Sequence, residues 1–348
     1  MHILHVSYSS KPVDGGISTS VAQLVDYQRL TIAGQVGWIR LDELGPSSIF
    51  HYVFLLLKLK PDILHIHGLW RYPTRLNSLY RLFNIRVVIS PHGMLHPEAL
   101  KASWLRKRVS FILFERPLFL PGHILHALNA FESSCIRSLL PQAHVITIPN
   151  GVLIRSRSNQ DCREFLSLPP DSKILLYFGR YHPGKNITQL AESWMSTSHL
   201  IDPNWWLVFV GYGDTSLLAC CDGRQNTRIR RFGPFFGEDK HIILSSVNAF
   251  VLPSAFEALP MSALEAMSYS LPCLLTDQCN MSFAFKANAA YRVDQNSLSG
   301  DLLKFFAMKS DEHLDMGDRA FSLVSSDYAW PRIASLFFSA YRSILAHP

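Results

Sequence analysis

The apolar and polar positions along the chain alternate between two patterns. Short, almost wholly apolar runs are followed by longer stretches in which apolar residues return every three or four positions, beginning with residues 2–8 (HILHVSY) and 18–30 (STSVAQLVDYQRL). Runs of the first kind are typical of buried strands, and stretches of the second kind are typical of amphipathic helices. Strands that alternate with helices predict βαβ units and a parallel sheet.

The same alternation continues to Gly151, with helical stretches such as SIFHYVFLLLKLK and AFESSCIRSLL between the strand candidates. Those further strand candidates are VGWIRL, DILHIHG, RVVISPHG, HILHALN and HVITIPNG. Residues 152–172 break the pattern, because they are polar, contain a Pro pair and show no clear period. A linker is therefore predicted there.

A second set of strand candidates begins at residue 173 and is again separated by helical stretches. They are KILLYFGR, WWLVFVGYG, RIRRFGPF, NAFVLPS and LPCLLT, and residues 330–348 follow as a final amphipathic helix. Two successive sets predict an α/β protein with two doubly wound, Rossmann-like domains, residues 1–151 and 173–329. Because ligands of such sheets bind beyond the carboxyl ends of the strands, the site is expected in a cleft between the two domains.

The composition of the chain excludes some classes of function but does not identify a single one. The chain has 348 residues, of which 48% are hydrophobic, and this length suits two domains. A net charge of +6 without a basic helix or tail argues against nucleic-acid binding and leaves an anionic substrate or an anionic membrane surface. The six cysteines lack C-x-x-C or zinc spacing, which predicts reduced thiols in a cytoplasmic protein. The first ten residues do not resemble a signal peptide, and no apolar run is long enough to cross a bilayer.

Glycines and cations follow predicted strands. Gly15 and Gly16 precede a helix that Ser18 or Thr19 could cap, and a helix start of this kind offers N–H groups to phosphate. The G-x-G-x-x-G spacing is absent, so an ordinary glycine loop fits equally well. Arg180 and Lys185 flank a Pro-Gly turn in YFGRYHPGKN, where a fork of donors and a point charge suit a diphosphate. A solvated basic turn is the alternative.

Two acids stand in the apolar stretch FVLPSAFEALPMSALEAMSYSLPCLLT, with no cation near them in sequence. Glu257 is expected in the loop after a strand, and Glu265 on the second turn of a buried helix that begins at Pro260. A buried carboxylate needs a partner, and ribose or sugar hydroxyls would satisfy it. The amides of Leu259 and Met261, near the helix start, could meet a phosphate.

Histidines also end strands. His92, in SPHGML, follows a strand and precedes a glycine, so a functional and a structural role are equally favoured. His65 and His67, in HIHGLW, end another strand, and for these two a structural role is favoured.

Taken together, these motifs resemble glycosyltransferase family 4, whose members are retaining enzymes with two Rossmann-like domains, the GT-B architecture. The resemblance covers nearly the whole chain and is greatest for bacterial members that build exopolysaccharide, capsule or O-antigen. Its most specific part is the E-x7-E spacing of Glu257 and Glu265 with Arg180 and Lys185 upstream. It is also carried by GGISTSV, HIHGLW, SPHGML, IPNGV, GRYHPGKN, FGPFFGEDK and the WPRI tail.

The resemblance implies a UDP- or GDP-sugar as the donor and a role for each residue of the second domain. Glu265 would bind the ribose hydroxyls, and Glu257 would contact the donor sugar or assist at the reacting centre. Arg180 and Lys185 would hold the diphosphate, and backbone groups around Gly233–Phe235 would meet the base.

For the first domain the resemblance implies contacts with the same donor and with the acceptor. Gly15 and Gly16 would approach the phosphates, and His92 would line the cleft near the donor sugar. His67 would lie on the acceptor side, where a saccharide linked to polyprenyl diphosphate is expected. The helix at 330–348 would cross back onto the first domain.

The chain departs from the family pattern at three places. Ala258 stands where a glycine is usual, Asn186 stands where a glycine often follows the lysine, and MSFAF follows TDQCN where relatives often carry a proline and an acid. The first two changes are small. The third removes groups that relatives use to contact the donor or the acceptor.

No D-x-D sequence is present, so a metal-independent transfer of a hexosyl group is predicted, in which cations and amides stabilise the leaving diphosphate. The resemblance implies that this transfer retains the anomeric configuration. No cofactor is expected. A nucleotide-sugar epimerase or hydrolase of the same architecture, or a non-catalytic nucleotide-sugar-binding protein, remains as an alternative. The segment KASWLRKRVSFILFERPLFLPG mixes basic and aromatic residues, which predicts either a helix on an anionic membrane or a core helix with a basic face.

Overall fold

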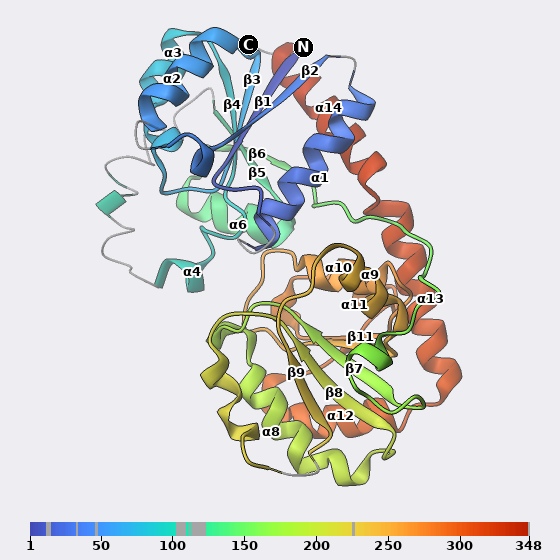
Figure 1. Ribbon diagram of the computed structural model, residues 1–348. Coiled ribbons are helices and arrows are strands. Elements are labelled where there is room, and N and C mark those ends of the chain that lie inside the picture. The colour runs from blue at the N-terminus through green and yellow to red at the C-terminus, as the bar shows by residue number, and fades with distance from the viewer. Residues whose placement is uncertain are drawn as a thin grey trace. The chain divides into compact units, whose positions relative to one another are not determined.

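The computed structural model of the protein describes residues 1–11, 15–32, 34–45, 48–101, 109–110, 112, 123–224 and 227–346. The chain divides into two compact units (Figure 1). The first contains Met1–Gly151 together with Trp330–Pro348, and the second contains Val152–Ala329.

The first unit is built on a six-stranded parallel sheet with the order β2-β1-β3-β4-β5-β6. Its strands are β1 (His2–Ser7), β2 (Gln35–Arg40), β3 (Ile63–His67), β4 (Arg86–Ser90), β5 (His123–Ala127) and β6 (His144–Thr147). The described helices are α1 (Gly16–Thr31), α2 (Ser48–Leu59), α3 (Asn77–Leu82), α4 (Pro97–Lys101), α6 (Ala130–Leu139) and α14 (Trp330–Ala346). The central strands are buried on both faces, and their isoleucine, leucine and valine residues pack there together with the buried polar side chains of His65, His67 and Ser90.

The second unit repeats this architecture with the strand order β12-β11-β10-β7-β8-β9. Its strands are β7 (Lys173–Phe178), β8 (Trp205–Val210), β9 (Ile229–Phe232), β10 (Ala249–Leu252), β11 (Cys273–Leu275) and β12 (Tyr291–Arg292). Its described helices are α7 (Cys162–Phe165), α8 (Ile187–Thr197), α9 (Gly237–Ser246), α10 (Met261–Met267), α11 (Ser282–Lys286), α12 (Leu298–Phe306) and α13 (Ser310–Asp327). The prediction of two parallel, doubly wound α/β sheets is confirmed.

The segment 152–172, for which a linker is predicted, lies in the second unit. Cys162 and Leu166 are buried there, and the amide of Cys162 donates to Ser246 Oγ over 3.1 Å at the end of α9. A few apolar side chains thus hold in place a segment whose composition is polar overall.

The C-terminal helix α14 belongs to the first unit, because Trp330 at its start is buried and donates to Gln23 Oε1 on α1 over 2.7 Å.

Among the described helices, none is both long enough and apolar enough to pass through a lipid bilayer.

Candidate active site

The turn after β7 holds the two predicted phosphate-binding cations. His182 caps it by accepting a hydrogen bond at Nδ1 from the amide of Gly184 over 3.1 Å. Asn186 is in the left-handed conformation, with φ 53°, and its side-chain amide donates to the carbonyl of Pro253 over 2.9 Å. Asparagine tolerates this conformation better than most residues other than glycine, so the departure from the family pattern at this position is accommodated. The turn is thereby tied to the loop after β10.

Lys185 and Glu257 form an ion pair between these two segments. Lys185 Nζ donates to Glu257 Oε1, and Ser254 Oγ donates to the same oxygen over 2.7 Å. The backbone of Glu257 is held as well, because its amide donates to the carbonyl of Gln278 over 2.9 Å and its carbonyl accepts from Asn280 Nδ2 over 2.6 Å. The partner of the first acid is therefore a lysine that lies far upstream in the sequence.

Glu265 has a lysine partner of its own. It lies on α10, and Lys240 on α9 donates to both of its carboxylate oxygens over 2.6 Å each. The Lys240 ammonium also lies 5.2 Å from the ring centre of Phe178, at the end of β7. Sequence reasoning did not select Lys240, although it belongs to the FGPFFGEDK motif and follows a strand as the other site residues do.

The remaining predicted residues of the second unit lie near these pairs in sequence but form no pair. Arg180 is exposed, and its guanidinium makes no hydrogen bond or ion pair with any described residue. Helix α10 begins at Met261 with Pro260 as its N-cap, so the prediction that Pro260 is the first helical residue is wrong. Leu259 and Met261 flank this proline at the start of α10.

In the first unit, Gly15 has φ 104°, a conformation that strongly favours glycine, and α1 begins directly after it at Gly16. The cap of α1 is therefore Gly15, three residues before Ser18, and the prediction that Ser18 or Thr19 caps the helix is wrong. Ser20 Oγ donates back to the carbonyl of Gly16 over 2.8 Å, within the first turn.

His92 follows β4 in a left-handed turn, with φ 51°. The turn is held by Glu132 on α6, whose buried carboxylate accepts from the amide of Gly93 over 2.6 Å and from the amide of Leu128 over 2.8 Å. Burial raises the pKa of this carboxyl. Sequence reasoning missed Glu132. The only signal was its position three residues after Asn129, whose side chain caps α6 by accepting from the amide of Glu132.

His92 also ends a chain of three hydrogen-bonded imidazoles. Gln28 Oε1 lies 2.8 Å from His5 Nε2, His5 Nδ1 lies 2.9 Å from His67 Nε2, and His67 Nδ1 lies 3.0 Å from His92 Nε2. An amide oxygen only accepts, so His5 Nε2 carries a hydrogen, and in neutral rings each following Nε2 must then donate to the preceding Nδ1. This order leaves His92 Nδ1 as an acceptor.

A second chain of hydrogen bonds runs through His65 and His126. His126 Nε2 donates to the carbonyl of Ile148 over 2.6 Å, so its Nδ1 accepts from Ser90 Oγ over 2.6 Å. Ser90 Oγ in turn accepts from His65 Nε2 over 2.6 Å, and His65 Nδ1 accepts from the hydroxyl of Tyr341 on α14 over 2.6 Å. We call these two chains together the imidazole network. It consists of His5, His65, His67, His92 and His126 with Gln28, Ser90 and Tyr341.

Burial keeps the imidazole network neutral. It lowers the pKa of His5 and of His126 to about 4 and that of His92 to about 3. For His65 and His67 burial again lowers the pKa well below the usual value, and the neighbouring imidazoles lower it further. All five rings are therefore uncharged at neutral pH.

Three of these histidines could be mistaken for a metal site. Ring nitrogens of His5, His65 and His67 lie within 4.8 Å of one another, and this is the one cluster of potential metal ligands within the described ranges. Each of their six ring nitrogens already has a hydrogen-bond partner. A metal ion would have to replace several of these bonds in a closed interior, so the arrangement fits a hydrogen-bonded core better.

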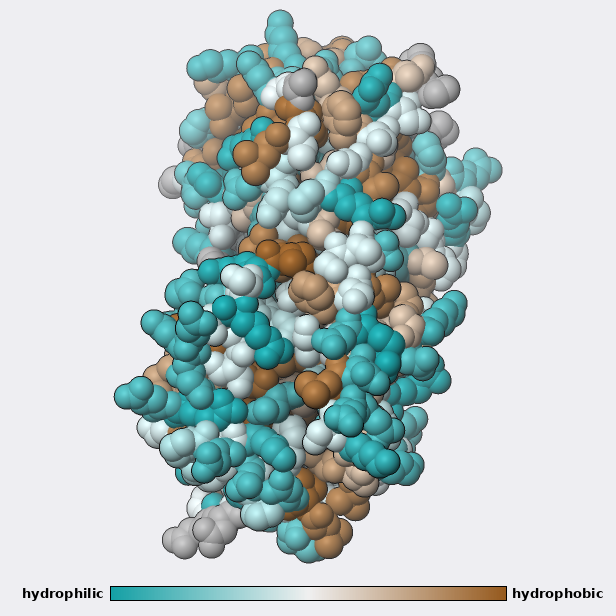
Figure 2. Space-filling view, turned by 90° about the vertical axis from the view of Figure 1, so that its right-hand side faces the viewer, coloured by the Kyte–Doolittle hydropathy of each residue, from teal (hydrophilic) through white to brown (hydrophobic). Residues whose placement is uncertain are grey.

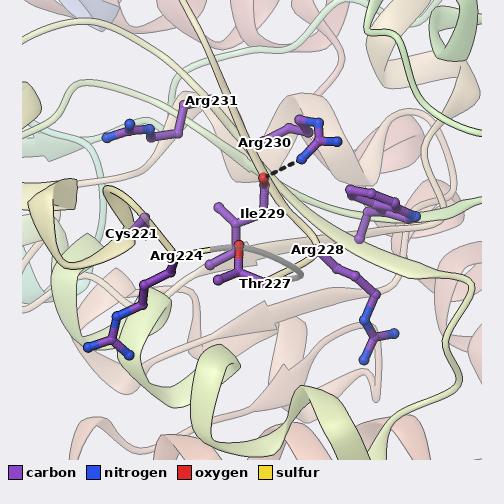
Figure 3. A pocket seen from close by; sticks show the side chains of 8 residues that line it. Cys221, Arg224, Thr227, Arg228, Ile229, Arg230 and Arg231 are labelled. Carbon is purple, nitrogen blue, oxygen red and sulfur yellow. Dashed lines mark hydrogen bonds between the residues drawn. The ribbon is translucent and has the colours of Figure 1, made fainter.

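A cavity of about 660 Å³ lies apart from these residues, beside the edge strand β9 (Figure 3). Arg230 donates to the carbonyl of Ile229 over 3.1 Å, and its guanidinium lies 4.6 Å from the ring centre of Trp206. Arg231 pairs with Asp222 over 2.5 Å. Arginines on an edge strand discourage pairing with another chain, and this explains the cluster without a ligand.

Two family models match the chain. Glycosyltransferase Family 4 matches residues 15–154, and Glycosyl transferases group 1 matches residues 158–320. Among curated proteins, the UDP-Gal:alpha-D-GlcNAc-diphosphoundecaprenol alpha-1,3-galactosyltransferase of Escherichia coli is 29% identical over 66% of this chain and 62% of its own length. The GDP-mannose:cellobiosyl-diphosphopolyprenol alpha-mannosyltransferase of Xanthomonas oryzae is 20% identical over 82% of this chain and 75% of its own length. The match thus spans about three fifths of the Escherichia coli protein and three quarters of the Xanthomonas protein.

Solved structures share the fold over nearly the whole chain. Sucrose-phosphate synthase from Thermosynechococcus elongatus has a TM-score of 0.83 at 19% identity and covers 99% of both chains. The Anabaena protein HepE in complex with UDP-glucose has a TM-score of 0.75 at 15% identity, over 98% of this chain and 99% of its own.

Proposed function

Because this chain belongs to the glycosyltransferases, with a family 4 half followed by a group 1 half in the GT-B fold, we propose that it transfers a sugar from a nucleotide-diphosphate sugar to a saccharide linked to polyprenyl diphosphate. The reaction would serve the synthesis of a bacterial surface polysaccharide. Both curated relatives described above are named for acceptors linked to a polyprenol diphosphate, and their donors are UDP- and GDP-sugars. The nucleotide of the proposed donor is accordingly UDP or GDP.

The observation that carries this proposal is the pair of lysine–glutamate contacts in the second unit. Lys185 with Glu257 and Lys240 with Glu265 place two cations and two carboxylates in the segments that follow β7, β9 and β10. A diphosphate needs cations, and the hydroxyls of ribose and of a hexose need acceptors. Both requirements of a nucleotide sugar are met by these four side chains.

Each side chain has a proposed role. Lys185 and Arg180, whose guanidinium has no partner among the residues that the structure describes, bind the diphosphate and stabilise it as it leaves, while Glu257, which Ser254 holds by a hydrogen bond, contacts the donor sugar. Glu265 accepts hydrogen bonds from the ribose hydroxyls, and Lys240 keeps its charge compensated. The amides at Leu259 and Met261 add donors beside the phosphates.

In the first unit, the direction of the imidazole network defines what His92 can do. Its Nε2 donates to His67, so Nδ1, which has no partner among the described residues, can only accept, and a sugar hydroxyl is a suitable donor. His67 has no free ring nitrogen, so its role is to orient His92 and not to contact an acceptor directly. Gly15 and Gly16 are proposed to approach the phosphates, since a glycine has no side chain that would keep a ligand from its backbone.

We also propose that transfer proceeds with retention and without a metal, and that the enzyme associates with an anionic membrane surface where its acceptor is presented. The basic, aromatic segment at 101–122, one candidate for that contact, lies almost entirely outside the described residues.

A thermal-shift panel of UDP, GDP and ADP with their common hexose conjugates tests the donor class. We expect either UDP or GDP, with its hexose conjugates, to raise the melting temperature. If no nucleotide of the panel stabilises the protein, the proposal is refuted. A transfer assay with the selected donor and a polyprenyl-diphosphate saccharide then distinguishes a transferase from an epimerase, a hydrolase or a binding protein, by its product. Loss of transfer in EDTA would refute metal independence, and inversion at the anomeric carbon would refute retention.

A further inference from the structure

Helix α2 in the first unit exposes large apolar side chains to solvent. The exposed fractions of Phe50 and Phe54 are 78% and 60%, and those of Ile49 and Leu57 are 39% and 38%. At about 100° per residue these four positions share an arc of roughly 140° around the helix. Tyr52 and Leu56 lie about 110° around the helix from the middle of this arc, and both are fully buried in the core of the first unit. The helix therefore has an inner and an outer apolar side.

The end of α3 continues this outer side. Leu82 is 77% exposed and Phe83 is 45% exposed. A cavity of about 720 Å³ joins the two helices, lined among others by Leu57, Lys60, Leu82, Phe83, Arg86 and Leu345. We call the region formed by Ile49, Phe50, Phe54, Leu57, Leu82 and Phe83 the α2 surface.

Single exposed apolar side chains are common, but six large ones in one region are not, and such patches mark interaction sites. Figure 2 shows the face of the molecule at the right of Figure 1, away from α2, and there brown side chains occur in small groups separated by hydrophilic ones. The α2 surface therefore needs a partner that can cover phenylalanine and leucine side chains.

Most charged residues in the part of the sequence that contains α2 and α3 are basic, although the acid Asp62 also lines the cavity. Between Glu43 and Glu98 the sequence contains a single acid, Asp62, and six basic residues: Lys58, Lys60, Arg71, Arg75, Arg81 and Arg86. Asp62 is already engaged, because it accepts from the amide of His2 over 2.7 Å and pairs with the amino terminus. Lys58 and Lys60 are exposed directly beside the apolar side chains, and Lys60 and Arg86 line the cavity.

Apolar aromatic side chains with a border of lysine and arginine match the interface of an anionic bilayer, where rings enter the headgroup layer and cations meet lipid phosphates. Exposed lysines are, by contrast, depleted at protein–protein interfaces. We propose that the α2 surface docks on an anionic lipid bilayer, with Phe50 and Phe54 inserted and Lys58 and Lys60 on the phosphates. This inference deepens the proposed function, since it assigns to α2 the membrane contact that a lipid-linked acceptor requires.

Vesicle flotation of the full chain tests the apolar part of this proposal. Vesicles contain phosphatidylcholine alone or phosphatidylcholine mixed with phosphatidylglycerol. The variant Phe50→Ser with Phe54→Ser is expected to bind the mixed vesicles on the order of 30-fold more weakly than the parent chain, because two aromatic anchors are lost. The matched control is Leu200→Ser with Leu314→Ser, two leucines of the second unit that are 64% and 66% exposed. The control is expected to bind as the parent does.

A second pair of variants tests the charges. Lys58→Gln with Lys60→Gln should weaken binding to the mixed vesicles by about 10- to 30-fold, and should leave the weaker binding to phosphatidylcholine alone unchanged. The matched control is Lys286→Gln, an exposed lysine of the second unit. All the substituted side chains are solvent-exposed, so the melting temperatures should stay within a few degrees of the parent value, which verifies folding.

Three outcomes would overturn the proposal. The parent chain could fail to float with mixed vesicles, or the serine variant could float as the parent does. Light scattering could also show that the serine variant dissociates an oligomer while vesicle binding is unchanged, and the α2 surface would then be an interface between copies of this chain. Stabilisation by UDP or GDP, measured on the same samples, separates a failure of docking from a failure of the proposed donor binding.

Discussion

In the first unit, five imidazoles lie in two hydrogen-bonded chains and carry no charge at neutral pH, whereas in the second unit two lysine–glutamate ion pairs lie at half-buried positions. A neutral, closed network exchanges partners only at great cost, because each buried ring nitrogen would lose its bond. A half-buried ion pair is less costly to rearrange, since water and ligand atoms can replace either partner.

This difference indicates separate tasks for the two sets of residues. The imidazole network fixes one ring, His92, and determines which of its atoms is free. The lysine–glutamate pairs hold charges that compensate each other until a ligand with phosphates and hydroxyls replaces them. The residues that hold His92 rigidly thus belong to the first unit, and the residues proposed to exchange partners with a ligand belong to the second unit.

Acidification should produce the largest difference in stability between the two units. Because the folded pKa values of these imidazoles lie well below the unfolded value of about 6.5, the unfolded state binds more protons below that pH. The contribution of these imidazoles to the free energy of unfolding is fully present above pH 6.5. It is lost as the pH falls towards 4, by about 1.4 kcal/mol per pH unit for each such ring. Several kcal/mol should be lost by pH 5. Hydrogen exchange at pH 7 and 5, corrected for intrinsic rates, should show weaker protection in β3 and α14 but not in β7 and β10. Equal losses in both units would contradict this.

Lys185→Ala should have the next largest effect. The substitution removes a cation from the proposed diphosphate site and leaves the Glu257 carboxylate without its ion-pair partner. Affinity for the stabilising nucleotide diphosphate should fall by about 100-fold, as expected for loss of a charge-assisted bond of about 3 kcal/mol. Calorimetric titration measures it. The control is Lys173→Ala, which breaks an exposed pair with Asp202 in the same unit and should change affinity less than twofold.

Arg180→Ala should weaken nucleotide binding on the order of 30-fold, corresponding to about 2 kcal/mol. Its guanidinium has no partner among the described residues, so the melting temperature of the free protein should not change. Arg224→Ala, at the β9 cavity, is the matched control, since it removes another exposed arginine of the second unit. If both variants lose affinity equally, the effect is one of general charge and Arg180 has no specific role.

Tyr341→Phe should give the smallest effect. It removes the hydroxyl that donates to His65 Nδ1 and leaves a buried acceptor without a partner, which should cost about 1–2 kcal/mol of stability in the first unit. Nucleotide affinity should be unchanged. Tyr291→Phe, a half-buried tyrosine of the second unit, is the control. Urea denaturation measures the stability of both variants, hydrogen exchange locates the loss in the first or the second unit, and calorimetric titration measures nucleotide affinity. A fall in affinity in the Tyr341 variant would show that the network and the ion pairs are not independent.

The sequence predicted the parallel sheets well, because strands buried on both faces are read from their own residues, as in DILHIHG and β3. It also predicted that a carboxylate on the buried helix, Glu265, needs a partner, and it expected ribose or sugar hydroxyls in that role. It did not predict a lysine partner for either acid. The contact of Lys185 with Glu257 joins the turn after β7 to the loop after β10, and only strand order brings these segments together. The ligand cleft and the roles of the site residues stay predictions.

The imidazole network was hidden from sequence reasoning for a related reason. His5 lies beside His65 in the register of β1 and β3, and His67 lies beside Ser90 in the register of β3 and β4. A shift of one residue in either register would turn these side chains to the other face of the sheet. Single histidines at strand ends therefore appeared as separate candidates, and not as parts of one structure.

Helix α14 has a consequence for the way the protein is made. It supplies Trp330 and Tyr341 to the core of the first unit, yet it emerges from the ribosome only after the whole second unit. The second unit can thus complete its fold before the first unit, because the sheet of the first unit packs with α14 only after α14 has been synthesised. During that interval His65 lacks its hydroxyl donor, and the unfinished half is the part that chaperones and proteases meet.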